Sequence, residues 1–567
     1  MFRRQASWAD SVNSDSPYPG LSSPLTSPPL LQARYSLGPD PAKWGCSLDL
    51  QDVDPDDELH QPDAKKPGDS DSRWGGHPLS LRGMSNIGCL FVLVVGLLVL
   101  FIGYPLLSFR QTELDASAAF NLGGRNGIPG NWGLIDAETP ADAYAKASWV
   151  GGEEMQLVFS DEFNTDGRSF YPGDDPYWEA VDLHYWATNN LEWYDPEAIT
   201  TSGGSLIITL SQKETHDLNY EGGALCAMQN KFCFTGGYIE ASVRLPGVNN
   251  VQGLWPALWT MGNLGRAGYG ASLEGMWPYT YDACDVGTAP NQTLNGQPLA
   301  ATVNGDTGHG GELSWLPGQR LSRCTCAGES HPGPTHSDGS YVGRAAPEID
   351  VFEAQITSID SKLVPQVSQS AQWAPFDAAY EWHNSSDFYI LADPTVSLMN
   401  TFRGSITQEA TSILTNTDPL CYEGTGGCYS VYGFEYKPGF DDGYITWISN
   451  NKVAWTIKGG GVGADDQTQI SARAVSQEPM YIIANLGMST NFGKVDLAHL
   501  PFPCHLAIDY IRVYQPKSAV NIGCEPPGFP TQDYINTYIE AYTNPNLTTW
   551  RNDFGQKFPK SSLLGQC

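Results

Sequence analysis

The sequence predicts an all-β fold for most of this chain, a sandwich or barrel built from many short strands. From about residue 151 to residue 515, runs of β-branched and aromatic residues alternate with turns rich in Gly, Pro and Asn. No long stretch with a period of 3.6 residues interrupts them, which argues against a helical domain. Aromatic residues make up 11% of the chain, in keeping with a sheet-rich protein.

The strand signal is clearest in six short segments that alternate between apolar and polar residues or are rich in β-formers. They are residues 206–210, 238–245, 444–448, 453–455, 481–486 and 508–514. Asn450 and Asn451 lie between two of these segments and predict a tight hairpin. In the extension that follows the β-rich region, residues 516–567, we expect one helix near residues 533–542.

The region before the β-rich part has a different composition. Residues 1–86 are rich in Ser, Pro and Asp and carry no apolar period, so we expect a disordered arm. Residues 87–107 contain no charged side chain and match the roughly 20 residues that a helix needs to cross a bilayer. We interpret them as a single transmembrane signal anchor, followed by a linker over residues 108–150.

Sequons and cysteines indicate which side of the membrane the β-rich part occupies. The three N-glycosylation sequons, at Asn291, Asn384 and Asn546, all follow the apolar segment, as do ten of the twelve cysteines. An even number of cysteines on one side of a span is typical of disulfides in an oxidising lumen, although the pairing stays open. We therefore expect a type II membrane protein with a cytosolic arm and a lumenal or extracellular body, in the endoplasmic reticulum, the Golgi or the plasma membrane.

Charge and metal-ligand spacing exclude several function classes. The formal net charge of −32 repels phosphate backbones and makes nucleic-acid binding improbable, whereas it does not repel a neutral polysaccharide. Cys324 and Cys326, like Cys421 and Cys428, have spacings that zinc sites also use, but few histidines lie near them. No calcium-loop pattern is present. We expect no metal site and no cofactor.

One hexad, Glu348-Ile349-Asp350-Val351-Phe352-Glu353, carries three carboxylates. On a regular strand Glu348 and Asp350 face one way and Glu353 faces the other, because side chains alternate. A β-bulge near Val351 and Phe352 inserts one extra residue and returns Glu353 to the face of the other two. We therefore predict that the three acids line one concave surface.

Two glutamates on one surface can carry out glycoside hydrolysis with retention of configuration. One attacks the anomeric carbon, and the other, kept protonated by its acidic neighbours, protonates the leaving oxygen. Between them the aspartate can hydrogen-bond the nucleophile. From the hexad alone, an acidic strand edge or a cation-binding strand remains an equal alternative.

The hexad resembles the E-x-D-x-x-E signature of family 16 glycoside hydrolases, the laminarinase-like β-glucanases. Further segments resemble that family in the same order, namely residues 160–163 (SDEF), 234–241 (FTGGYIEA), 253–259 (GLWPALW) and 508–514 (IDYIRVY). The resemblance covers residues 151–515 and implies a concanavalin-like jelly-roll β-sandwich. It implies Glu348 as the nucleophile, Asp350 as its assistant and Glu353 as the acid/base residue.

A second resemblance is to the fungal β-glucan synthesis-associated proteins of the Skn/Kre type. It rests on residues 259–266 (WTMGNLGR), 276–282 (MWPYTYD), 316–321 (LPGQRL), 346–350 (APEID) and 542–550 (YTNPNLTTW). It implies a membrane protein that assembles cell-wall β-1,6-glucan and β-1,3-glucan, with β-glucan as substrate and glucan-synthesis machinery as a partner. A glycosidase or transglycosylase is the favoured function, and a non-catalytic glucan-binding or scaffold protein is the alternative.

Two features near the hexad affect the substrate site. Trp255 and Trp259 are candidates for stacking on sugar. Because they flank the region of Pro256, we expect that they do not share one face and that at least one belongs to the core. In simple laminarinases the Trp motif lies close to the hexad, whereas here an insert of about residues 263–346 separates them and can reshape or roof the cleft.

Overall fold

The computed structural model describes residues 81–98, 133–227, 231–302, 318–374, 382–405 and 408–567. The chain divides into two units, one holding helix α2 (Leu81–Leu98) and the other holding the β-rich body. Among the described residues, no helix combines the length and apolarity needed to cross a membrane. The rest of the predicted span, 99–107, and the predicted arm up to residue 80 lie outside the described residues, as does the predicted linker up to residue 132.

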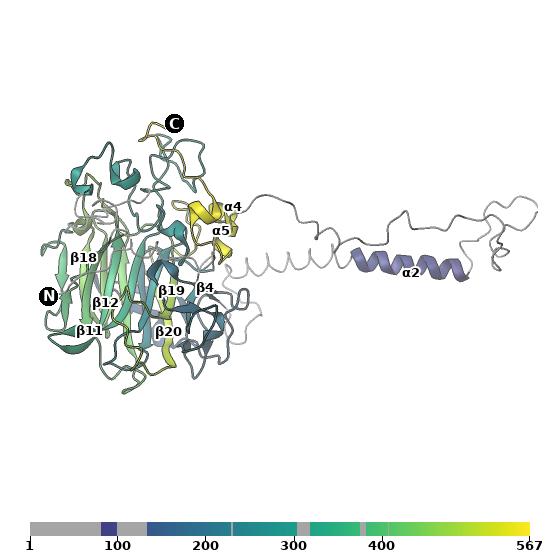
Figure 1. The fold of residues 1–567 in the computed structure, drawn as a ribbon, viewed down its shortest axis with the longest axis horizontal. Coiled ribbons are helices and arrows are strands. Elements are labelled where there is room, and N and C mark those ends of the chain that lie inside the picture. Colours follow the sequence, from purple (N-terminus) through teal and green to yellow (C-terminus); the bar gives the residue numbers. More distant parts are fainter. Residues whose placement is uncertain (1–80, 99–132, 228–230, 303–317, 375–381, 406–407) are drawn as a thin grey trace, which may run out of the picture. The chain divides into compact units, whose positions relative to one another are not determined.

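The body consists of two ten-stranded sheets (Figure 1). The first runs in the order β1 (Ala145–Ala147), β2 (Glu154–Asp161), β20 (Cys504–Pro516), β9 (Gly237–Arg244), β16 (Ser430–Lys437), β17 (Tyr444–Ser449), β18 (Lys452–Lys458) and β13 (Tyr389–Leu391), with β7 (Leu206–Leu210) beside β20 and β6 (Ile199–Thr201) beside β7. The second runs in the order β14 (Ser397–Met399), β15 (Glu409–Asn416), β12 (Lys362–Trp373), β11 (Glu348–Ile359), β10 (Trp255–Gly262), β19 (Met480–Gly487), β8 (Tyr220–Cys226), β5 (Glu192–Tyr194) and β4 (Leu183–His184), with β3 (Glu179–Ala180) also pairing with β8.

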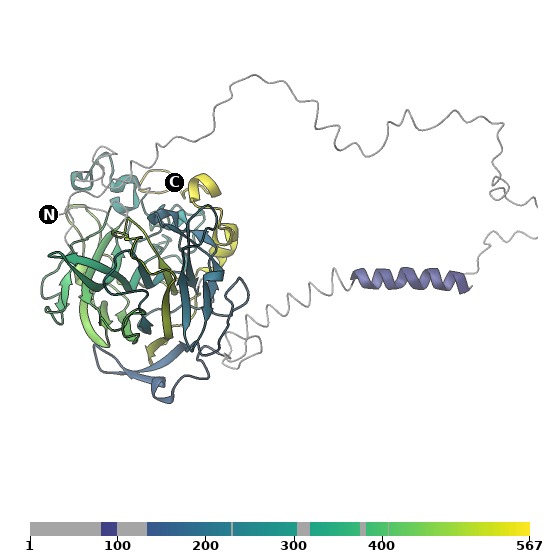
Figure 2. The ribbon, with the colours of Figure 1, turned by 60° about the horizontal axis from the view of Figure 1, so that its bottom comes forward.

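Helical elements in the body are short and lie between or after the strands. The 3-10 and π turns are η5 (Ala141–Tyr144), η6 (Trp186–Thr188), η7 (Pro196–Ala198), η8 (Gly270–Ser272), η9 (Val286–Thr288), η10 (Pro290–Gln292), η11 (Leu299–Thr302), η13 (Gly459–Val462) and η14 (Trp550–Phe554). Among the described residues of the body, the α-helices are α4 (Gln532–Thr537) and α5 (Ile539–Thr543), which lie at the edge of the sandwich (Figures 1 and 2).

The predicted all-β architecture is confirmed. Five of the six predicted segments lie wholly in strands, and the sixth, 238–245, extends one residue past the end of β9. Asn450 and Asn451 have φ values of 50° and 58°, so the predicted hairpin closes through two left-handed residues. The extension differs in detail, because two short helices replace the single predicted one. A further difference concerns residues 108–150, which the sequence predicts to be a linker. Strand β1 lies within this segment and pairs with β2 of the sandwich.

Apolar side chains from both sheets fill the space between them. Phe352 of the second sheet packs on Tyr432 of the first, with ring centroids 5.0 Å apart, and Trp447 stacks on Trp455 at 4.1 Å. All four are essentially excluded from solvent. Burial of such a side chain stabilises a fold by roughly 1.5–3 kcal/mol, so this layer holds the second sheet at a fixed distance from the first.

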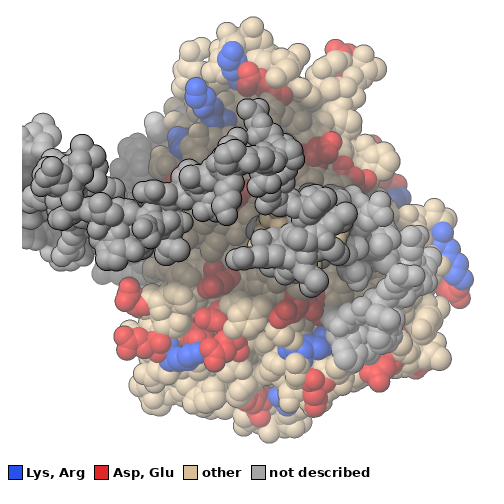
Figure 3. All heavy atoms as spheres, turned by 90° about the vertical axis from the view of Figure 1, so that its right-hand side faces the viewer, with Lys and Arg blue, Asp and Glu red and all other residues tan. Residues whose placement is uncertain are grey.

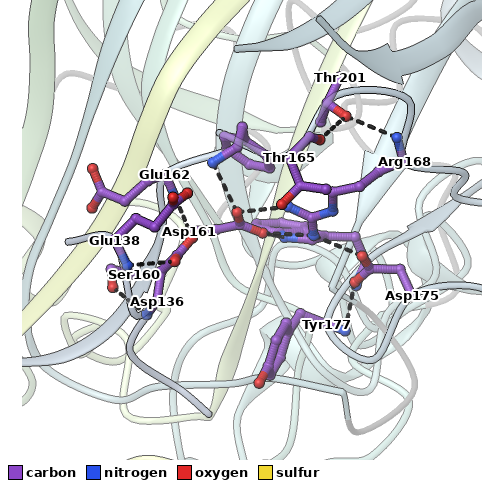
Figure 4. A network of polar contacts seen from close by, with 12 residues as sticks. Asp136, Glu138, Ser160, Asp161, Glu162, Thr165, Arg168, Asp175, Tyr177 and Thr201 are labelled. Carbon is purple, nitrogen blue, oxygen red and sulfur yellow. Dashed lines mark hydrogen bonds and ion pairs between the residues drawn. The ribbon is translucent and has the colours of Figure 1, made fainter. Parts of the chain in front are cut away.

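The SDEF segment, residues 160–163, forms a buried ion network (Figure 4). Arg168 donates to both carboxylate oxygens of Asp161, at 2.7 and 2.9 Å, and to Asp175 at 2.6 Å. The indole of Trp178 also donates to Asp161, at 2.8 Å. Burial raises the pKa of Asp175, whereas the Arg168 charge opposes that rise. In this structure the segment therefore fastens residues 161–178 to the edge of the sandwich.

The insert and the C-terminal extension hold each other in place. The guanidinium of Arg266, in the insert, donates to the carbonyl oxygens of Ala541, Asn544 and Leu547 at 2.7–2.9 Å. The described disulfides are Cys233–Cys524, Cys284–Cys324, Cys326–Cys567 and Cys421–Cys428. Cys324, Cys326, Cys421 and Cys428, whose spacings zinc sites also use, all form disulfides, as the sequence predicts. Cys226 and Cys504 are buried and form no disulfide.

Candidate active site

A β-bulge in β11 decides where the three acids of the hexad point. On the β12 side, the four steps from Ile349 to Glu353 face only the three steps from Ala371 to Ser368. The register with β10 shifts at the same place, between Leu258 and Trp259. The predicted extra residue is therefore present, and it returns the last glutamate to the face of the first two.

Core side chains hydrogen-bond to two carbonyl groups of the bulged segment. The indole of Trp447, from the opposite sheet, donates to the Asp350 carbonyl at 2.8 Å. The amide of Gln369 donates to the carbonyls of Val351 and Ile448, both at 2.9 Å. Because buried carbonyls without partners are costly, these two side chains stabilise the bulge and bridge the sheets.

Glu348, Asp350 and Glu353 line one cleft of about 420 Å3 on the open face of the second sheet. A cleft of this size can bind a short oligosaccharide. Aromatic side chains supply much of its wall, as expected for a site that stacks on sugar rings. They are Tyr185, Tyr194, Trp255, Trp259, Tyr269, Trp277, Phe402 and Phe492.

Each outer glutamate receives one hydrogen bond from an indole. Trp277 Nε1 donates to Glu348 Oε2 at 2.5 Å, and Trp255 Nε1 donates to Glu353 Oε1 at 2.9 Å. Both glutamates are half-buried. The two indoles come from different places, because Trp255 begins β10 whereas Trp277 lies in the insert. The insert therefore forms part of the wall and contributes directly to the acid cluster.

Asp350 is fixed by neighbours on β12. Ser370 Oγ donates to Asp350 Oδ2 at 2.6 Å, and Gln372 Nε2 approaches the same oxygen at 3.4 Å. Burial and the charge of Asp350 raise the pKa of the neighbouring Glu348.

The electrostatics of the cleft keep protons on the acids. Burial, reinforced by the charges of Asp350 and Glu353, raises the pKa of Glu348 well above its usual range. Burial and the Asp350 charge raise the pKa of Glu353 to about 8, and burial raises the pKa of Asp350 to about 6. Glu353 is thus suited to donate a proton near neutral pH.

The two candidate stacking residues both reach the cleft. The pairing of β10 with β19 continues without a shift through Pro256, and Trp255 and Trp259 lie on the same face. The expectation that they do not share a face was wrong, because an even separation keeps two residues on one side of a strand. Trp259 also belongs to the core, as expected of at least one of them. Trp255 stacks on Phe492 with centroids 4.3 Å apart, so one of its faces is covered.

A network behind Trp259 presents fixed polar groups to the cleft. Trp259 Nε1 donates to Asn485 Oδ1 at 2.8 Å, which turns Asn485 Nδ2 toward the Tyr194 hydroxyl at 3.2 Å. Asn190 Nδ2 donates to the same hydroxyl at 3.1 Å and to the buried carboxylate of Glu192 at 2.7 Å. Since an indole only donates and a carboxylate only accepts, both amide orientations are fixed.

The three sequons are at the surface or near it. Asn384 and Asn546 are exposed, and Asn291 is half-buried. Acidic side chains outnumber basic ones over the chain, 63 to 31, and Figure 3 shows both kinds on the described part of one face.

The sequence analysis did not identify several residues of the cleft. Ser370 and Gln372 lie on β12 opposite the hexad, so they could be found only if the pairing of these two strands were known. Trp277 is separated from Glu348 by seventy positions of the sequence, and Phe402 lies in a loop. Only the three-dimensional fold brings these two to the cleft.

Comparisons with known proteins give a consistent family match. The family described as "Beta-glucan synthesis-associated protein SKN1/KRE6/Sbg1" matches residues 46–567. The β-glucan synthesis-associated protein KRE6 of Saccharomyces cerevisiae is 40% identical over 534 residues, which is 92% of this chain and 70% of that protein. SKN1 of Candida albicans is 39% identical, over 91% of this chain and 67% of that protein.

Solved structures of glucanases are similar at low identity. The catalytic domain of an endo-1,3-β-glucanase (laminarinase) from Thermotoga petrophila is 18% identical, with a TM-score of 0.36, and the match covers 64% of this chain and 99% of that domain. An endo-β-1,3-glucanase from Pyrococcus furiosus is 16% identical, also with a TM-score of 0.36, over 66% of this chain and 98% of the other.

Proposed function

This chain belongs to the SKN1/KRE6/Sbg1 family of β-glucan synthesis-associated proteins, and we propose that it cleaves or transfers β-glucan chains with retention of configuration. The observation that carries the proposal is the bulge in β11, which brings three carboxyl groups to one aromatic-walled cleft. The alternative from the hexad alone, an acidic strand edge, does not explain why an indole N–H donates to each of two separate glutamates.

In the first step, Glu348 attacks the anomeric carbon and forms a glycosyl-enzyme ester. Glu353 donates its proton to the leaving oxygen as the glycosidic bond breaks. The hydrogen bond from Trp277 stabilises the charged form of Glu348 and fixes the orientation of its carboxylate. Because its pKa is raised, Glu353 still holds near neutral pH the proton that this step consumes.

Asp350 acts on the nucleophile and touches no reacting atom. When Asp350 holds a proton, its charge no longer opposes ionisation of Glu348, and the nucleophile is active. The bond from Ser370 keeps the Asp350 carboxyl in this position. After attack, the Asp350 proton is available to Glu348 as it departs in the second step.

In the second step, water or a sugar hydroxyl attacks the ester, and Glu353 removes its proton. Water gives hydrolysis, and a sugar hydroxyl gives transglycosylation. Membership of a family named for β-glucan synthesis favours transfer, with β-1,6-glucan and β-1,3-glucan of the fungal cell wall as substrates. Other components of the glucan-synthesis machinery are the partners that this role requires.

We also propose a location. The protein is anchored by residues 87–107 as a type II membrane protein of the secretory pathway, with its β-rich body lumenal or extracellular and glycosylated at Asn291, Asn384 and Asn546. The disulfides of the body support an oxidising compartment. Protease treatment of sealed microsomes checks this, since a lumenal body survives intact whereas a cytosolic one is digested.

The catalytic proposal is tested with the purified full chain and defined β-1,3- and β-1,6-linked gluco-oligosaccharides. Shorter or longer products are separated by mass, and Glu348→Gln is expected to abolish them. Glu154→Gln, a change at an exposed glutamate on β2, serves as the control and leaves product formation unchanged. Glucan binding without any product from the unmodified protein refutes catalysis and supports a glucan-binding or scaffold role.

A further inference from the structure

The turn that follows β19 lies beside the indole that donates to Glu353. Gly487, the last residue of β19, pairs with Trp255. In the turn, the Phe492 backbone N–H donates to the Ser489 carbonyl at 3.2 Å. The Phe492 ring stacks on the Trp255 indole, with centroids 4.3 Å apart and planes 3° from parallel. Because Trp255 Nε1 donates to Glu353, only one side chain separates this turn from the proposed proton donor.

One buried carboxylate fixes the start of the turn. Glu192, on β5, has no exposed surface, and its Oε2 accepts the Met488 backbone N–H at 2.8 Å. Its Oε1 accepts a hydrogen bond from the side-chain amide of Asn190 at 2.7 Å. A Cβ at position 487 would collide with Glu192 Oε1, so the carboxylate packs against the backbone at a place where only glycine fits. Glu192 thereby fastens the end of β19 to β5.

Further hydrogen bonds hold the base of the turn in place. The Leu191 N–H donates to the Met488 carbonyl at 3.0 Å, and Ser489 Oγ donates to the Thr188 carbonyl at 2.5 Å. Met488 and Ser489 are almost completely buried, whereas Phe492 is half-buried and lines the cleft. The turn therefore has a fixed base and presents one aromatic ring to the cleft.

The stack restricts rotation of the Trp255 indole. Phe492 covers one face of the indole, while its N–H donates to Glu353 at 2.9 Å, so a rotation of Trp255 would break both contacts. Glu353 must be held in one orientation, because the leaving oxygen that it protonates has a defined position. A misplacement of about 1 Å at such a site can lower a rate by about a hundredfold.

We propose that Glu192 and Phe492 are positioning residues for the proton donor of the first step. Glu192 holds the turn, and the turn keeps the Phe492 ring on Trp255. The indole of Trp255 then orients the carboxyl group of Glu353. This inference rests on the proposed retaining function. Glu192 does not line the cleft, so its effect on the reaction passes through these other side chains.

The test uses the full chain and two aryl glycosides of the same β-1,3-linked glucotriose. A phenolate leaving group requires protonation, whereas a dinitrophenolate is stable enough to leave without it. For Glu192→Gln we expect kcat/KM to fall about tenfold with the phenyl glycoside and by less than about twofold with the dinitrophenyl glycoside. The substitution keeps the shape of the side chain but provides one acceptor oxygen for two N–H donors. Because the sugar part is identical, weaker sugar binding would lower both values together.

Further variants make the result specific. Phe492→Ala removes the covering ring and is expected to show the same selective loss, which decides the question if Glu192→Gln does not fold. Phe492→Tyr keeps the ring and is expected to restore the rate with the phenyl glycoside. Trp255→Phe removes the N–H itself and therefore gives the size of the full effect.

Glu435→Gln is the matched control for Glu192→Gln. Glu435 is also fully buried and accepts a backbone N–H, that of Trp149, but it lies on β16 of the first sheet and does not line the cleft. The kcat/KM values of this variant should match those of the unmodified protein, even where its Tm falls as far as that of Glu192→Gln.

The outcomes separate the two proposals. An equal loss with both glycosides overturns the positioning inference, because Glu192 and Phe492 then serve the binding of the sugar chain. Unchanged rates in a folded Glu192→Gln protein overturn it as well, and both results leave the catalytic proposal standing. No cleavage of glycosides or gluco-oligosaccharides by the unmodified protein overturns the catalytic proposal and, with it, the positioning inference.

Discussion

The indole of Trp277 offers a direct test of how the cleft controls its acids. Trp277→Phe keeps an aromatic ring in the wall and removes only the N–H that donates to Glu348. That hydrogen bond favours the charged form of Glu348 and lowers its pKa against the opposing effects of burial and of Asp350. Without the bond, the pKa of Glu348 must rise further.

The size of the change follows from the strength of one hydrogen bond to a charged group. Such a bond contributes about 1.5–3 kcal/mol, which corresponds to roughly one to two pH units at 1.36 kcal/mol per unit. Water that enters the vacated space replaces part of the lost interaction, so we expect a shift of about one pH unit. The reactive form needs a charged Glu348, and the acidic limb of the pH profile therefore moves to higher pH.

The assay is the pH dependence of kcat/KM on a gluco-oligosaccharide, with thermal unfolding of each variant as the check on folding. Trp255→Phe is the matched comparison, because it removes the equivalent bond from Glu353. The pKa of Glu353, raised to about 8 in the native cleft, should rise further, and the basic limb should move to higher pH. Trp277→Phe is therefore expected to narrow the bell-shaped pH profile of kcat/KM, and Trp255→Phe is expected to widen it. An acidic limb that stays fixed in a well-folded Trp277→Phe protein would refute the reasoning.

Three other predictions concern stability and modification. Arg168→Met leaves two buried aspartates without their cation, and we expect a loss of about 3–5 kcal/mol in urea unfolding; a loss below about 1 kcal/mol would contradict the account of this network. Cys567→Ser opens a disulfide of sequence separation 241 and should lower Tm more than Cys421→Ser, which opens one of separation 7. Equal shifts in Tm would argue against that ranking. Asn384→Gln and Asn546→Gln should each increase electrophoretic mobility of the protein from a eukaryotic host, and unchanged mobility would exclude glycosylation at that position.

The sequence predicted the site best where local rules determine the structure. The alternation of a strand, broken by one extra residue, was enough to place Glu353 beside Glu348 before any pairing was known. The expectation that Trp255 and Trp259 lie on different faces fails, because the pairing of β10 with β19 continues without a shift through Pro256. The alternation of side chains along a strand therefore continues through a proline when the backbone hydrogen bond that proline cannot donate is not needed at that position.

Other parts of the site depend on contacts between segments that are distant in sequence. Trp277 reaches Glu348 only because the insert folds back over the end of β11, and no periodic pattern marks that return. Disulfide pairing is similarly non-local, since Cys326 pairs with the last residue of the chain. Nothing in the sequence around Phe402 distinguishes this exposed residue from other loop residues. Non-local contacts of this kind leave no trace in a window of ten or twenty residues.

The two indole donors also explain why the insert and the extension belong to the chemistry. The sandwich alone supplies the donor to Glu353, whereas the donor to Glu348 comes from the insert. The insert is held in turn by the extension, through Arg266 and the Cys326–Cys567 disulfide. A change that loosens the extension should therefore act first on the orientation and protonation of Glu348. For this reason, truncation of the extension should raise the acidic limb of the pH profile in the same direction as Trp277→Phe, while leaving the basic limb in place.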